Sequence, residues 1–142
     1  MSSLAGRKSY TENQMILLDT HVLIWALAAP GRVGRRLSQK IQSDQAVRFS
    51  PLSIFEARLL HLKGKLPKLP ENLAFLANQI GVVELTYDAS AAEAARNYQD
   101  LMGTDPFDWM LVAQAQSAGC DFYTADLRLL GLGLPFIKDA TL

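Results

Sequence analysis

Five acidic side chains have the type and the placement to do chemistry. Asp19 ends an apolar run, Glu56 lies in SIFE, Asp105 and Asp108 lie in DPFD, and Asp126 lies in TAD. Each acid has an ordinary explanation as a helix cap, in which a short polar side chain accepts hydrogen bonds from free backbone N–H groups. If several of them meet in one small volume, however, they repel one another, and such an arrangement needs a cation to neutralise it.

The chemistry that such a cluster implies is metal-assisted hydrolysis of a phosphate ester. Oxygen donors without paired cysteines or clustered histidines suit a hard divalent ion, Mg²⁺ or Mn²⁺. Such an ion lowers the pKa of a bound water and offsets the charge that develops on the phosphoryl group, so no nucleophilic Ser or Cys is required. The single cysteine, Cys120, excludes an internal disulfide and a thiolate metal site.

Alternating strand and helix patterns supply the elements that must position these acids. Short apolar runs predict strands over 15–18, 46–49, 82–86, 121–124 and 136–138. Helical spacing with Pro and Gly signals predicts helices over 21–29, 33–42, 50–63, 71–80, 88–102, 105–118 and 126–130. This order is typical of the α/β class, and we expect a three-layer α/β/α sandwich with a central, mainly parallel sheet.

The predicted sheet brings the acids to one edge. In open α/β sheets the ligand site lies beyond the carboxyl ends of the strands, where the strand order reverses. Asp19 and Asp126 each follow a predicted strand, so we expect both at this edge. Helices that enter from the same edge would bring Glu56 and Asp108 towards them. The alternative explanation for Glu56 is a capping box with Ser53.

Length and composition fit one domain. A chain of 142 residues with 49% hydrophobic residues is long enough to bury a core without cross-links. We expect residues 1–14 to form a disordered leader and residues 15–142 to form the single domain. No run approaches the roughly 18 apolar residues of a membrane span, and the N-terminus lacks the apolar centre of a secretory signal. We therefore expect a cytoplasmic protein without a membrane partner.

Charge is polarised along the sequence, although the formal net charge is zero. Residues 1–70 hold eleven Lys and Arg against four Asp and Glu, whereas residues 71–142 hold three against ten. Basic clusters in the first half have the character of phosphate-backbone contacts, and the candidates are Arg32, Arg35, Arg36, Lys40, Lys63 and Lys65. The alternative is that these residues belong to solvated helix faces.

Four segments resemble the ordered motifs of PIN domains, in particular of VapC toxins from bacterial type II toxin–antitoxin pairs. They are LLDTHVLIW at 17–25, SPLSIFEARL at 50–59, DPFDWMLVAQA at 105–115 and FYTADLRL at 122–129. The resemblance implies a PIN fold and an Mg²⁺-dependent endoribonuclease that is specific for single strands. It also implies a homodimer held inactive by a VapB-type antitoxin, whose C-terminal segment enters the acidic groove.

The resemblance also assigns roles to residues by position. The family's four catalytic, metal-binding acids fall on Asp19, Glu56, Asp108 and Asp126. Asp105 is a close neighbour that shares the role of the third acid. Thr20 and Thr124 match polar positions beside the acids, where they would orient carboxylates or metal-bound waters, and ordinary local capping is the alternative. Where close relatives read H-R-D-P-F-D-R, this chain lacks the His and both Arg.

Three other functions compete with this hypothesis. An aspartyl phosphatase needs a second acid two residues after Asp19, where His21 stands. A phospho-accepting receiver domain would use Asp88 and Lys138, and it leaves Glu56, Asp108 and Asp126 without a role. A PIN-like fold that has lost activity would be a catalytically silent protein-binding module, and the presence of all four acids argues against it.

Overall fold

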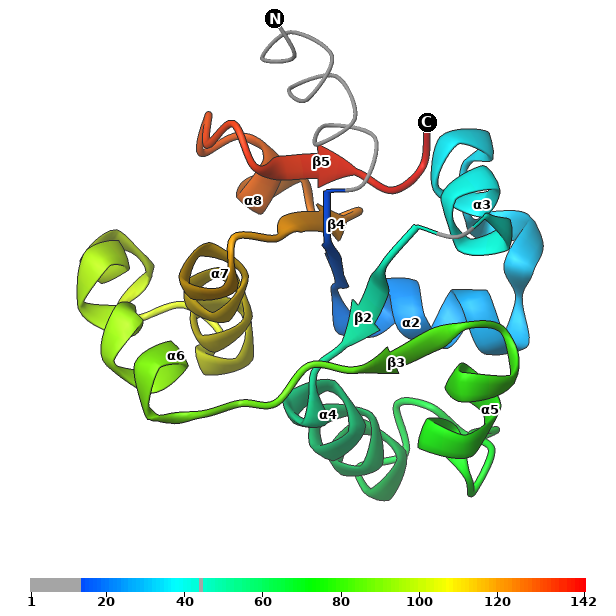
Figure 1. Cartoon of the computed structure of the whole chain (residues 1–142). Coiled ribbons are helices and arrows are strands. Elements are labelled where there is room, and N and C mark those ends of the chain that lie inside the picture. Colours follow the sequence, from blue (N-terminus) through cyan, green and yellow to red (C-terminus); the bar gives the residue numbers. More distant parts are fainter. Residues whose placement is uncertain (1–13, 44) are drawn as a thin grey trace, which may run out of the picture.

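Five short parallel strands form one sheet in the computed structural model of the chain, which describes residues 14–43 and 45–142. The strands are β1 (Ile16–Leu18), β2 (Val47–Phe49), β3 (Val82–Glu84), β4 (Asp121–Thr124) and β5 (Ile137–Asp139). They lie in the order β3-β2-β1-β4-β5, and each neighbouring pair is parallel (Figure 1). The parallel sheet predicted from the sequence is confirmed. The predicted leader, residues 1–14, lies outside the described residues except for Gln14.

Helices connect the successive strands. They are α2 (Thr20–Ala28), α3 (Arg35–Gln42), α4 (Pro51–Leu62), α5 (Leu73–Gln79), α6 (Ala89–Glu93), α7 (Pro106–Ala118) and α8 (Leu127–Leu130). Two 3-10 segments, η1 (Pro30–Arg32) and η2 (Ala94–Leu101), follow α2 and α6. Within the described ranges, none of these helices combines the length and the apolar composition that crossing a membrane requires.

The single helix predicted over 88–102 is wrong, because α6 gives way to η2 there. Tyr98 leaves the helical region with φ −129° and ψ 50°. Its ring packs edge-on against Phe136, with the ring centroids 6.2 Å apart. This tertiary contact outweighs the helix propensity of the Ala-rich run.

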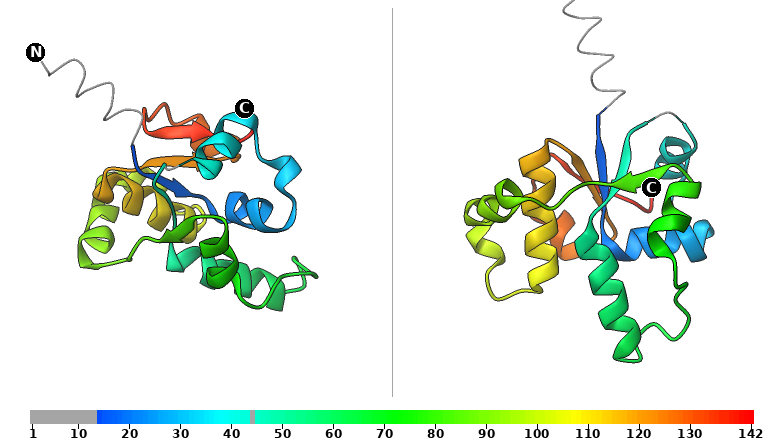
Figure 2. Two further views of the ribbon diagram at one scale, coloured as in Figure 1. Left: turned by 45° about the vertical axis from the view of Figure 1, so that its right-hand side comes forward. Right: turned by 60° about the horizontal axis from the view of Figure 1, so that its bottom comes forward.

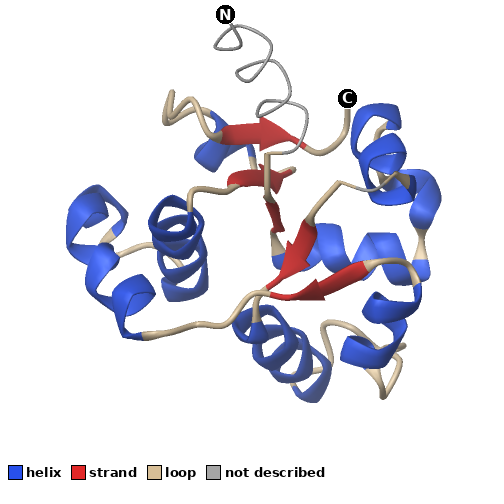
Figure 3. Ribbon diagram, in the orientation of Figure 1, coloured by secondary structure: helices blue, strands red, loops and turns tan. Residues whose placement is uncertain are grey.

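The side chains of β1 show why helices cover both faces of the sheet. Ile16 and Leu18 belong to a core that includes residues of α2, α3 and α5, whereas Leu17 belongs to a second core with residues of η2, α7 and α8. All three side chains are buried, as expected for a central parallel strand. The two helical layers lie on opposite sides of the strands (Figure 3), which confirms the three-layer α/β/α sandwich.

The order of strands reverses between β1 and β4. The chain runs from β1 to β2 and β3 on one side, and it then returns to β4 and β5 on the other side. The carboxyl ends of β1 and β4 are neighbours, with Leu18 paired to Tyr123. Helix α4 extends away from the sheet on the side where α2 begins (Figure 2, right). The fold therefore places a topological switch point where Asp19 and Asp126 follow their strands.

Candidate active site

A pocket of about 380 Å³ lies at this switch point. All five acids singled out from the sequence line it: Asp19, Glu56, Asp105, Asp108 and Asp126. The other lining residues are His21, Trp25, Ala125 and Arg128. Asp19, Glu56 and Asp108 are only 7 to 8% exposed, whereas Asp105 is exposed and Asp126 is half-buried. The predicted convergence of carboxylates from α4, α7 and the ends of β1 and β4 is therefore present.

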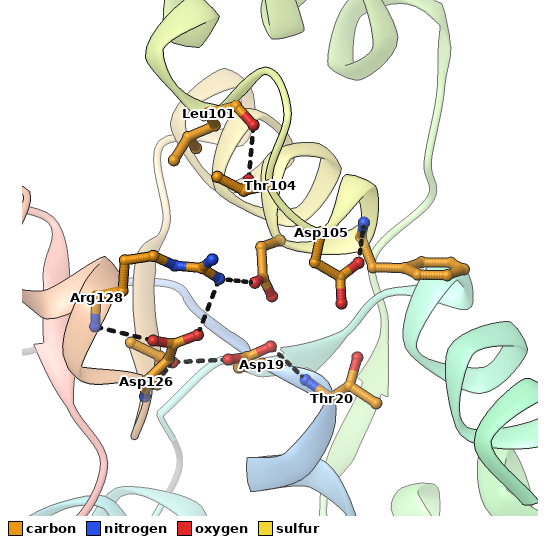
Figure 4. A network of polar contacts seen from close by, with 10 residues as sticks. Asp19, Thr20, Leu101, Thr104, Asp105, Asp126 and Arg128 are labelled. Carbon is orange, nitrogen blue, oxygen red and sulfur yellow. Dashed lines mark hydrogen bonds and ion pairs between the residues drawn. The ribbon is translucent and has the colours of Figure 1, made fainter.

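Asp19 is held by hydrogen bonds on both carboxylate oxygens. It is the N-cap of α2, and its Oδ1 accepts a hydrogen bond from the backbone N–H of Thr20 at 2.8 Å. Its Oδ2 accepts from the hydroxyl of Thr124 at 2.6 Å. The backbone N–H of Asp19 also donates to the carbonyl of Tyr123 on β4, at 2.9 Å. Figure 4 shows the two hydrogen bonds that the carboxylate of Asp19 accepts.

Glu56 is held by a chain of two hydroxyl groups. The hydroxyl of Thr20 donates to Glu56 Oε1 at 2.5 Å, and the Oγ atoms of Thr20 and Ser53 are 2.9 Å apart. Because a hydroxyl carries one proton, Thr20 donates to the carboxylate and accepts from Ser53. The alternative explanation of Glu56, a capping box with Ser53, is wrong, whereas the helix start predicted at residue 50 is confirmed. Ser50 is the N-cap of α4, and it precedes Pro51 and accepts a hydrogen bond from Leu52 N at 3.1 Å.

Arg128 forms ion pairs with two acids of the pocket, Asp108 and Asp126. Its Nη2 lies 2.7 Å from Asp108 Oδ2 and 3.3 Å from Asp126 Oδ2. Asp126 is the N-cap of α8, where its Oδ1 accepts from the backbone N–H of Arg128 at 2.9 Å. Asp105 caps α7 in the same way, through the backbone N–H of Phe107. Three acids of the pocket, Asp19, Asp105 and Asp126, are therefore also helix caps, as the ordinary explanation expected.

Burial raises the pKa of each of the three buried acids. Burial is the largest cause for Asp19 and for Glu56, and hydrogen bonds to both carboxylates oppose it. For Asp108, burial and then the charge of Asp19 raise the pKa to about 7. The adjacent guanidinium of Arg128 favours the ionised form of Asp108 and so acts against this rise. The pocket thus holds carboxyl groups whose ionisation a bound cation would favour.

The donors of the pocket fit a hard divalent ion in chemical type. They are carboxylate oxygens, the ligands that Mg²⁺ prefers, and two buried threonine hydroxyls stand behind them. Across residues 14–43 and 45–142, no three His, Cys, Asp or Glu side chains are arranged to hold one ion together. Mg²⁺ commonly takes one or two carboxylates directly and keeps several waters, and this pocket suits that mode of binding.

None of the six predicted nucleic-acid contacts lines the pocket. Arg32 is the one that approaches it, because its guanidinium lies 4.3 Å from the ring centroid of Trp25, which lines the pocket. Arg35, Arg36 and Lys40 lie on α3, whereas Lys63 and Lys65 follow the end of α4. Their contact with nucleic acid stays a prediction.

Sequence reasoning missed three residues that shape the site. Ser53 is fully buried behind Glu56, and its place inside α4 depends on where that helix begins. Trp25 lines the pocket one turn into α2, and Arg128 reaches it from α8. The sequence feature that could have pointed to Arg128 is its position two residues after Asp126, where its backbone N–H donates to the carboxylate of that N-cap. The receiver alternative fits less well, because Asp88 and Lys138 do not line this pocket.

Comparison with known proteins agrees with this fold. The family model of the PIN domain matches residues 16–133. A chain of the DNA-bound VapBC from Salmonella typhimurium is similar, with a TM-score of 0.62 and 25% identity over 89% of this chain and 98% of that one. A chain of a toxin–antitoxin complex from Klebsiella pneumoniae has a TM-score of 0.60 and 18% identity over 88% and 97% of the two chains.

A third similar structure is VapBC2 from Rickettsia felis bound to a DNA fragment from their promoter. Its matching chain has a TM-score of 0.60 and 9% identity, over 88% of this chain and 98% of that one. No curated protein matches the sequence. The family model covers most of the chain, from β1 past α8, and includes every acid of the pocket. The chain therefore belongs to the PIN domain family.

Proposed function

We propose that this protein is a metal-dependent endoribonuclease and the VapC-type toxin of a toxin–antitoxin pair. One observation carries the proposal, namely five carboxylates gathered in a single pocket at the switch point of the sheet. Membership of the PIN domain family supports it. The similar solved chains, which come from VapBC and toxin–antitoxin complexes, support the assignment to this type.

In this proposal the carboxylates of Asp19, Glu56, Asp108 and Asp126 would together hold Mg²⁺, or Mn²⁺ in its place, one or two of them directly and the others through waters of the ion. When bound, the ion supplies an activated water and offsets negative charge at the scissile phosphodiester. Thr124 and Thr20 keep the carboxylates of Asp19 and Glu56 in fixed orientations. Asp105 stands at the exposed rim of the pocket and adds negative charge there.

The substrate that we propose is single-stranded RNA. The six basic residues named above would contact its phosphates, and Arg32 is the best placed because Trp25 holds its guanidinium beside the pocket. We also propose residues 15–142 as the nuclease domain, a homodimer as the assembly and a VapB-type antitoxin as the protein partner. Light scattering of the purified chain tests the assembly, since a monomer would contradict it.

Cleavage of RNA by the purified full-length chain tests the enzymatic proposal. We expect a single-stranded RNA to be cut in Mg²⁺ and to stay intact in EDTA. Asp19→Asn should abolish cleavage because it weakens the cation site while keeping the shape of the side chain. Glu93→Gln is the matched control, since Glu93 is exposed on α6 and does not line the pocket.

Two results would count against the nuclease. Cleavage that persists in EDTA would exclude a metal-dependent reaction. Full activity of Asp19→Asn would exclude the acidic pocket as the site of cleavage. A chain that binds a VapB-type antitoxin but cuts no RNA in Mg²⁺ or Mn²⁺ would instead support the catalytically silent binding module.

A further inference from the structure

Arg128 is the only cationic side chain in direct ionic contact with an acid among the described residues. Both of its contacts use the same nitrogen, Nη2, which lies between Asp108 on α7 and Asp126 at the start of α8. The side chain of Arg128 is 50% exposed, whereas that of Asp108 is 12% exposed. The guanidinium of a half-exposed side chain therefore pairs with a carboxylate that is almost buried.

The position of Arg128 is fixed from its backbone as well. Its N–H donates to Asp126 Oδ1 at 2.9 Å while its Nη2 approaches Asp126 Oδ2. The backbone and the side chain of Arg128 thus both contact the carboxylate that caps its own helix. A side chain anchored in this way loses little additional freedom when its guanidinium pairs with Asp108, so the pair with Asp108 is more favourable than an unanchored surface ion pair.

We propose that Arg128 is an internal counter-ion of the acidic pocket, which a divalent metal must displace from Asp108 and Asp126 in order to bind. This inference rests on the proposed function, because it concerns the metal of that same site. The guanidinium and a metal ion compete for the same oxygen atoms, Oδ2 of Asp108 and Oδ2 of Asp126. Arg128 would therefore set the affinity of the pocket for metal and offset part of the negative charge of Asp108 and Asp126 before metal arrives.

Direct metal titration tests this competition. Isothermal titration calorimetry of the full chain with Mn²⁺ and with Mg²⁺ should give a dissociation constant about three- to tenfold lower for Arg128→Gln than for the parent, as expected for loss of a partly exposed ion pair. Arg96→Gln removes one positive charge from an exposed position outside the pocket, and its dissociation constant should stay within about twofold of the parent.

A measurement on the parent protein avoids reliance on a variant that fails to fold. Side-chain ¹⁵N NMR should show the guanidinium protons of Arg128 exchanging faster with solvent as Mg²⁺ is added, because the metal releases them from the two carboxylates. Those of Arg58, which bonds to the carbonyl of Pro70 at 2.8 Å away from the pocket, should not change.

The outcomes separate this inference from the proposed function. Equal metal affinity of the parent and Arg128→Gln, with no change at the Arg128 guanidinium, would overturn the inference and leave the metal-dependent nuclease standing. A parent protein that binds neither Mn²⁺ nor Mg²⁺ would overturn both. Tighter binding by Arg128→Gln together with release of the guanidinium supports the counter-ion role.

Discussion

Replacing Asp108 by asparagine should stabilise the metal-free protein at pH 8. The folded protein raises the pKa of Asp108 from 3.8 to about 7, through burial first and the charge of Asp19 next. Between these two values the folded state binds more protons than the unfolded state, so stability falls as the pH rises through this window. Asparagine keeps the shape of the side chain and an oxygen that accepts a hydrogen bond from Arg128, and it removes the unfavourable ionisation.

The size of the gain follows from the shift. A rise from 3.8 to about 7 corresponds to roughly 4 kcal/mol of destabilisation once Asp108 is fully ionised. This value is an upper limit, because Arg128 lies 2.7 Å from Asp108 and favours its ionised form. We expect about half of it, roughly 2 kcal/mol at pH 8, which is about 6 °C in Tm for a domain of this length. At pH 4, where folded Asp108 is protonated, the gain should be close to zero.

Urea denaturation in EDTA at pH 4, 6 and 8, followed by circular dichroism, measures this difference. Asp100→Asn is the control, since Asp100 is exposed on η2 and does not line the pocket. A gain of equal size at pH 4 and pH 8 would show that ionisation of Asp108 is not its source. A loss of stability at pH 8 would show that the ion pair with Arg128 outweighs burial, and it would refute this reasoning.

Three further predictions concern metal binding, the threonine that bonds to Asp19, and the core. Adding Mg²⁺ at about 100 times its dissociation constant should raise the free energy of unfolding of the parent by about 2.7 kcal/mol, and EDTA should reverse this; an unchanged thermal transition would contradict a metal site. Thr124→Val should cost about 1 to 3 kcal/mol in urea denaturation, because it leaves the buried Oδ2 of Asp19 without its 2.6 Å hydrogen bond, and an unchanged midpoint would contradict that role. Leu17→Ala, at a fully buried position in the central strand, should cost about 2 to 5 kcal/mol, and a loss below 1 kcal/mol would show that this core is loosely packed.

Local patterns predicted the sheet and the acids because both depend on short stretches of chain. Each strand is a brief apolar run, and Asp19 and Asp126 directly follow two of them. Once the strands are parallel, their carboxyl ends must share an edge, which explains why these acids meet. The Ser50-Pro51 signal correctly predicted where the helix that carries Glu56 begins. The contact of Glu56 with Thr20 followed less directly, because it depends on how α4 packs against α2.

Features that depend on distant contacts were beyond the same reasoning. The ion pair of Arg128 requires α8 to place its side chain over α7, twenty residues earlier in the chain. The break at Tyr98 requires the ring of Phe136 to pack against it. The basic residues form clusters in the sequence, yet none of the six lines the pocket, and Arg32 contacts it through Trp25.

Asp19, Asp105 and Asp126 each begin a helix as well as facing the pocket. Replacing any of them with alanine would remove the N-cap of a helix together with a negative charge. An inactive alanine variant would therefore not distinguish the loss of a catalytic group from fraying of the helix. Asparagine or serine would keep the N-cap hydrogen bond from the backbone N–H and remove the negative charge. A related chain without catalytic activity could therefore keep this fold with asparagine or serine at the three positions. Neutral residues of this kind at all three positions would identify such an inactive chain from its sequence.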